Sequence, residues 1–118
     1  MAFHVVRPQE LDWLTRDHEP DEAARHTAEL SERLGLATGR ANLWRYEPGA
    51  KGRRHRHREQ EETFVVLAEI HGERAGGVVH VEPGTPLQTV NHGDVDLLVY
   101  AHGAPPEPER AELLDSAL

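Results

Sequence analysis

The sequence predicts an all-β domain, an antiparallel sandwich or barrel, with a short N-terminal helical segment. From residue 40 onward, short stretches rich in Val, Leu and aromatic residues recur, each bounded by Gly, Pro or Asn. Short strands at this spacing are typical of antiparallel sandwiches and barrels. The chain has 118 residues, which is enough for one domain with a hydrophobic core of its own.

The first element that we predict is a helix in DEAARHTAELSERLG, from Asp21 to Gly35. Asp21 follows a proline and suits an N-cap, and Gly35 suits the residue just past a helix C-terminus. The apolar stripe of this helix comprises Ala23, Thr27, Leu30 and Leu34. The same stretch also suits a segment beside a strand, held in another conformation by tertiary contacts. We therefore expect an N-terminal arm with a short helix (1–38), a β-barrel (39–104) and a C-terminal tail (105–118) that ends in a helical turn or two.

The barrel region begins with an alternating stretch. ANLWRYEP places Asn42, Trp44 and Tyr46 on one face of a strand. The next stretch, ETFVVLAEI, is apolar on both faces, as in a strand covered on both sides. GVVHVEPG, LQTVN and DLLVYAHG follow as further strands. We expect Trp44 and Tyr46 to pack in the core or at an interface, or to form the floor of a small-molecule pocket.

Composition narrows the classes of partner. The formal net charge is −8 and the pI is about 5.5, which argues against nucleic acid or an anionic membrane as a partner. The chain has no cysteine, and therefore no disulfide and no thiolate metal site. The first residues lack the basic and apolar regions of a signal peptide, and no apolar run is long enough for a membrane span. We expect a soluble, cytoplasmic protein.

The stretch GRRHRHREQEETFVVL carries the chemistry. Residues two apart in a strand share a face, so His55 and His57 can bind one ion together. Glu62 heads the next apolar strand, where an antiparallel neighbour would bring its carboxylate alongside. Two imidazoles and one carboxylate form a facial set that suits Zn, Mn, Fe, Ni or Cu and leaves positions open for water or substrate. We therefore predict a divalent-metal site at His55, His57 and Glu62.

Several neighbouring residues are alternatives. Glu61 is the rival carboxylate, because a shift of one residue exchanges the two faces; we prefer Glu62, which shares the interior face with Phe64. We expect His80 to be a hydrogen-bonded wall residue rather than a ligand. The basic cluster could form an anion-attracting rim, but we expect it to be a solvated outer face. This cluster comprises Lys51, Arg53, Arg54, Arg56 and Arg58.

These residues resemble a known pattern. Gly49 followed by His55, His57 and Glu62 resembles the first motif of the cupin superfamily, and EPGTPLQTVNHGD, with Gly84 and Asn91, resembles the second. The resemblance covers roughly residues 42–104 and is to small single-domain cupins. It implies an antiparallel jelly-roll barrel. In metal-bearing members the first motif supplies two histidines and a glutamate, and the second supplies a third histidine.

The sequence departs from the cupin pattern in three places. Leu87 occupies the position of the third metal-binding histidine, and the adjacent Gln88 faces the other way in a regular strand. Glu69 replaces the glycine that closes the first motif. Only six residues, Ile70 to Ala75, separate the two motifs, which leaves room for a turn but not for a hairpin. We therefore expect a shortened barrel, or one that a partner subunit completes.

We expect a pocket inside the barrel that takes a small-molecule ligand. With a metal present, dioxygenase, isomerase or epimerase chemistry fits this fold, and the sequence does not choose among them. Leu87 favours the alternative of a metal-free module that binds a small ligand, and the short link favours a purely structural barrel. Val65 and Leu67 on the outer face of their strand need to be covered by the helix or by another subunit, and we expect a homodimer.

Overall fold

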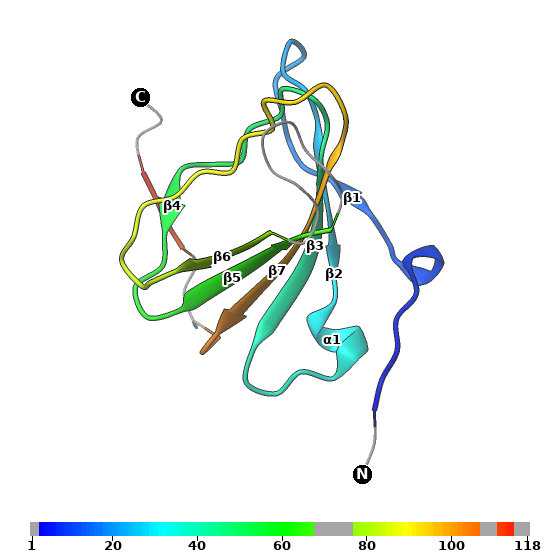
Figure 1. Cartoon of the computed structure of the whole chain (residues 1–118), viewed down its shortest axis with the longest axis vertical. Helices are drawn as coiled ribbons and strands as arrows, with labels where there is room; N and C mark the ends of the chain where they lie inside the picture. The colour runs from blue at the N-terminus through cyan, green and yellow to red at the C-terminus, as the bar shows by residue number, and fades with distance from the viewer. Residues whose placement is uncertain (1–2, 68–76, 107–110, 115–118) are drawn as a thin grey trace.

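The computed structural model describes residues 3–67, 77–106 and 111–114, and nearly all of its regular elements are antiparallel strands. Six strands form one sheet in the order β1-β2-β3-β7-β5-β6, and β4 pairs with β8 (Figure 1). The strands are β1 (Leu14–Thr15), β2 (Arg25–Glu29), β3 (Arg40–Tyr46), β4 (His55–Arg56), β5 (Glu61–Val66), β6 (Val78–Val81), β7 (Leu97–Ala104) and β8 (Glu112–Leu113). The predicted all-β, antiparallel fold class is confirmed.

A second wall faces the large sheet. Residues 49–57 run antiparallel to residues 84–91, held by backbone hydrogen bonds such as Gly52 N to Thr89 O at 2.8 Å and Gly84 N to His57 O at 2.7 Å. β8 extends this wall on the other side of β4, through pairing of Leu113 with His55. In Figure 1, β4 and β8 lie to the left of the long strands β3 and β7. The site lies between these two walls.

The inner face of the large sheet follows from its register. β7 lies between β3 and β5, so that Gly103 is opposite both Arg40 and Glu62, and Ala101 is opposite both Asn42 and Phe64. The hydrophobic core lies on the same face of the sheet, near the end of β3 at Tyr46 and the start of β7 at Leu97. The core comprises Tyr46, Ala50, Val66, Leu97 and Val99, with Ala23, Trp44 and Phe64 packed against it. The predicted common face of Asn42, Trp44 and Tyr46 is confirmed, since all three line one cavity.

The helix predicted from Asp21 to Gly35 is wrong over most of its length. Arg25–Glu29 is strand β2, which pairs with β3 over five residues, and the helix that remains is α1 (Ser31–Leu34). In β2, His26 and Ala28 are buried on one face, so the stretch also carries an alternating pattern, and pairing with β3 decides between the two. Gly35 does end α1 in the left-handed conformation (φ 68°), as predicted.

Two short elements complete the description, a 3-10 turn η1 (Pro8–Glu10) and the strand β8. β8 replaces the helical turn expected in the tail, as far as residues 111–114 are concerned. The short link from Ile70 to Ala75, and Glu69 before it, lie outside the described residues. Among the described residues, no helix is long and apolar enough to cross a membrane.

Asn91, which the second motif contains, anchors the loop between the walls. Its side chain is completely buried, donates hydrogen bonds to the carbonyl oxygens of Tyr46 and Val95 at 2.9 Å, and accepts one from Gly93 N at 2.9 Å. Gly49 makes the accompanying turn with φ 86°, a conformation that favours glycine. The end of β3, and with it Tyr46, is therefore fixed relative to the second wall.

Candidate metal centre

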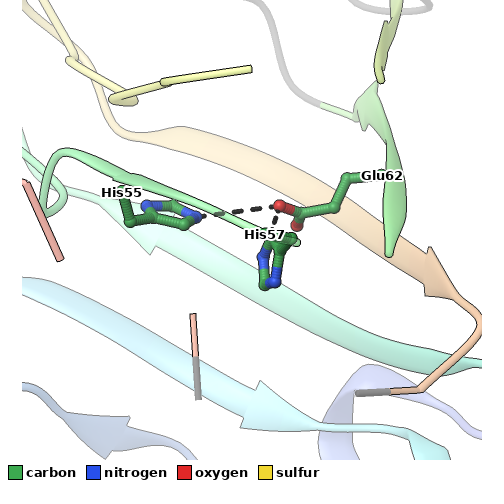
Figure 2. Close-up of side chains that lie close together, drawn as sticks. All are labelled: His55, His57 and Glu62. Carbon is green, nitrogen blue, oxygen red and sulfur yellow. Dashed lines mark ion pairs between the residues drawn. The ribbon is translucent and has the colours of Figure 1, made fainter. Parts of the chain in front are cut away.

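The structure brings His55, His57 and Glu62 together. One ligand atom of each residue lies within 4.8 Å of the others. The Nε2 atoms of His57 and His55 lie 2.7 and 3.7 Å from Oε1 of Glu62 (Figure 2). The two imidazole rings are perpendicular, with centroids 5.3 Å apart. His55 lies in β4, His57 follows it directly, and Glu62 lies in β5, so the cluster joins the two walls. The predicted proximity of the three residues is observed, but β4 and β5 belong to different sheets and are not the antiparallel neighbours that the sequence suggested.

The backbone orients His55 for binding a metal. Its Nδ1 lies 2.8 Å from the carbonyl oxygen of Arg53. In the neutral imidazole, Nδ1 must carry the proton in order to donate to this carbonyl, so that the lone pair is on Nε2, the atom nearest Glu62. A hydrogen bond from the second ring nitrogen to a backbone carbonyl is also the usual arrangement behind a metal-bound histidine.

The electrostatics of the cluster favour a charged pair in the metal-free protein. Burial acts to raise the pKa of Glu62, but the adjacent imidazoles of His55 and His57 outweigh it and lower this pKa to about 2. The Glu62 carboxylate in turn raises the pKa of His55 above its ordinary value, against the opposing effect of burial. In the metal-free protein, a protonated imidazole therefore compensates the charge of the Glu62 carboxylate. A metal cation between the three residues would compensate the same charge.

The three residues fit a divalent cation. The Glu62 side chain is only 12% exposed, and its Oε1 accepts no well-aligned hydrogen bond from the described residues although His57 Nε2 lies 2.7 Å away. A buried carboxylate oxygen of this kind can accept a cation placed between the three residues. Two nitrogens and one carboxylate oxygen form a donor set that zinc and the first-row transition metals accept.

Leu87 stands beside this cluster, as the sequence predicted. It forms an antiparallel bridge with His55 and lines the same cavity. Residues directly opposite each other across antiparallel strands project to the same face. The adjacent Gln88 faces away and donates a hydrogen bond to the carbonyl oxygen of Gly52 at 2.9 Å. The described residues therefore offer three protein ligands and an apolar side chain where a fourth would stand.

A cavity of about 340 Å³ lies over the cluster, between the two walls. Trp44 and Tyr46 form part of its lining, with ring centroids 5.8 Å apart, and Phe64 and Leu87 add apolar surface. Ala111 and Leu113 line it from the C-terminal segment. This size suits a small molecule.

Four arginines also line the cavity, and three of them were not anticipated. They are Arg16, Arg25, Arg40 and Arg53. Only Arg53 belongs to the basic cluster that the sequence singled out, and Arg56 of that cluster instead pairs with Glu112 outside the cavity. Arg40 could have been found, because it continues the alternating face of Asn42 and Trp44. Arg16 and Arg25 reach the cavity through the pairing of β2 with β3, which local sequence does not reveal.

Glu61 and His80, the alternative ligands considered from the sequence, lie outside the cluster. Glu61 points to the outer face of β5, where its Oε2 lies 3.3 Å from Nε2 of His80 and both side chains are about half exposed. Neither residue lines the cavity. The structure thus places Glu62, and not Glu61, beside His55 and His57, and it places His80 on the outer face beside Glu61.

Comparison with known proteins identifies the fold. No family model and no curated protein matches the sequence. Among solved structures, the chain is similar to a cupin-superfamily sugar phosphate isomerase from Silicibacter pomeroyi, with 23% identity over 86% of this chain and 76% of the other, and a TM-score of 0.70. A predicted oxalate decarboxylase from Thermotoga maritima has 20% identity over 86% and 99% of the two chains and a TM-score of 0.72.

A cupin 2 conserved barrel domain protein from Rhodopseudomonas palustris covers even more of the chain. The match spans 98% of this chain and 88% of the other, with a TM-score of 0.69 and 9% identity. Identities this low establish the fold and leave the activity open. The resemblance inferred from the two motifs is thus confirmed at the level of the fold: this is a small cupin-type barrel in which three residues could hold a metal ion.

Proposed function

We propose that His55, His57 and Glu62 bind a divalent metal ion and that the cavity above them binds a small polar molecule. One observation carries the proposal: two imidazole nitrogens and a buried carboxylate oxygen lie within 4.8 Å of one another at a cavity. When bound, the ion supplies Lewis-acid or, with iron, manganese or copper, redox chemistry. The donor set suits Zn, Mn, Fe, Ni or Cu.

The protein residues have separate roles in this proposal. His55 and His57 are neutral nitrogen donors, and Glu62 lowers the charge of the centre. In the neutral ring, the hydrogen bond to the carbonyl of Arg53 holds the proton on Nδ1 of His55 and leaves the lone pair of Nε2 for the metal. The apolar side chains of Phe64 and Leu87 limit the access of water to this end of the cavity.

Neighbouring structures support a small polar substrate. Two of them are described as a sugar phosphate isomerase and a predicted oxalate decarboxylase. A second function, binding of a small ligand without metal, is favoured by Leu87, which makes the position of a fourth ligand apolar. A homodimer and a cytoplasmic location remain predictions from the sequence.

Elemental analysis tests the proposal. The protein would be purified without chelator and without a metal-affinity tag, beside a His55→Ala/His57→Ala variant. A His80→Ala variant is the matched control, since it also loses a histidine beside a glutamate, but on the outer face. We expect near-stoichiometric metal in the wild type and the control, and none in the double variant. Absence of metal from the wild type after reconstitution would favour the metal-free function.

A further inference from the structure

The cavity is strongly cationic although the protein is acidic. Its lining contains four arginines and one carboxylate, that of Glu62, among the described residues. The whole chain has a formal net charge of −8. Positive charge concentrated in a concave site within a negative molecule focuses the electrostatic potential there. A site of this kind selects anions.

The cavity arginines differ from the other described arginines in their partners. Elsewhere, guanidinium groups form ion pairs, as Arg45 does with Asp96 at 2.9 Å and Arg56 with Glu112 at 2.8 Å. None of the four cavity arginines forms an ion pair with a carboxylate of the described residues. Guanidinium groups around one cavity repel one another, and an anion bound among them would relieve this repulsion.

Three of the four gather at one end, around Arg25. Arg25 is half-buried, its guanidinium carbon lies 5.5 Å from the centroid of the Trp44 ring, and it is directly opposite Tyr46 across β2 and β3. Burial lowers the pKa of Arg25, and the positive charges of Arg16 and Arg53 lower it further. The charges of Arg16 and Arg53 thus reach Arg25, and all three side chains line the same cavity. The aromatic face and the phenol hold Arg25 in place, so that little side-chain entropy is lost when an anion binds.

We propose that Arg16, Arg25 and Arg53 form a subsite for the anionic group, carboxylate or phosphate, of a small molecule whose other end reaches His55, His57 and Glu62. Planar guanidinium groups bind both kinds of oxyanion through paired hydrogen bonds. Arg53 precedes His55 by two residues on the same wall, about 7 Å along an extended chain. A molecule of a few carbon atoms spans this distance. The inference deepens the proposed function, because it names the class of ligand.

The test uses metal-free protein, so that it is independent of the metal proposal. Inorganic phosphate and malonate, which carry similar charge near pH 7, would be titrated at constant ionic strength into chelator-treated wild type and into His55→Ala/His57→Ala. The indole N–H signals of Trp44 and Trp13 in NMR spectra report binding, since Trp44 lines the cavity and Trp13 does not. We expect saturable shifts of the Trp44 signal with at least one probe in both proteins.

Arginine variants locate the binding. Arg25→Met and Arg53→Met should each weaken it about tenfold or more, the loss expected for one charge-assisted pair. Arg45→Met removes the same charge from the outer face of β3 and should leave it unchanged. Arg53 is exposed, so Arg53→Met tests the subsite even where Arg25→Met fails to fold.

The two probes distinguish the two sources of the anion. Binding of phosphate alone identifies a phosphate ester as the ligand class, and binding of malonate alone identifies a carboxylic acid. Absence of saturable binding, or equal weakening by Arg45→Met, would overturn the subsite. Because all arms lack metal, a failed elemental analysis would leave this result standing, and the reverse also holds.

Discussion

The buried carboxylate gives a quantitative prediction for Glu62→Gln in the metal-free protein. Glutamine has the shape of a protonated glutamate, so the substitution removes the charge and little else. The pKa of Glu62 falls from 4.5 to about 2, and each pKa unit corresponds to about 1.4 kcal/mol. The charged form therefore stabilises the fold by up to about 3 kcal/mol, which for a chain of this length corresponds to about 10 °C in Tm.

The pH dependence has a definite sign. Because the pKa of Glu62 is lowered in the folded protein, its contribution is present above 4.5 and is lost as the pH falls toward 2. Because the pKa of His55 is raised, its contribution is present below 6.5 and is lost as the pH rises through the folded-state value. The cost of Glu62→Gln should therefore be largest near pH 5.5 and smaller at pH 8.5, where a neutral imidazole no longer compensates the buried carboxylate.

Urea unfolding with chelator present measures this cost. Glu61→Gln is the matched control: it removes the adjacent carboxylate, which is 58% exposed and pairs with His80 on the outer face. An exposed pair contributes less than about 1 kcal/mol. A loss below about 1 kcal/mol for Glu62→Gln at pH 5.5, or equal losses in the two variants, would refute the electrostatic reasoning.

Two further predictions concern the second wall. Leu87→His places an imidazole opposite His55, and we expect zinc affinity in a chelator competition to rise at least about tenfold, whereas Gln88→His, on the other face, should give no gain. Equal affinity of the two variants would contradict the position of Leu87. Asn91→Ala removes the three hydrogen bonds of a fully buried side chain and leaves the carbonyl of Tyr46 without this donor, so we expect the free energy of unfolding in urea to fall by about 2–4 kcal/mol. A loss below about 1 kcal/mol would show that the loop does not depend on this side chain.

The grouping of His55, His57 and Glu62 could be predicted because it depends largely on alternation within single strands. Alternation places His55 and His57 on one face, and the same alternation sets Glu62 with Phe64 rather than with Glu61. The strands β3, β5, β6 and β7 were likewise visible as stretches bounded by turn residues.

The sequence predictions that were wrong or incomplete concern strands that pair with distant parts of the chain. Residues 21–35 carry both a helical stripe and an alternating pattern, and the choice depends on β3, which follows in the chain. The same error concealed the cationic end of the cavity, because Arg25 faces inward only if it lies in a strand opposite Tyr46. The sequence did not predict β8, because it follows prolines in the C-terminal tail and forms a strand by pairing with the distant β4.

The most direct test of the metal centre is an anomalous difference map from crystals of the protein loaded with zinc. We predict one strong peak bonded to Nε2 of His55, Nε2 of His57 and the carboxylate of Glu62, at about 2.0–2.2 Å from each atom. Absence of a peak at these three residues, or a peak at Glu61 and His80 on the outer face instead, would contradict the account.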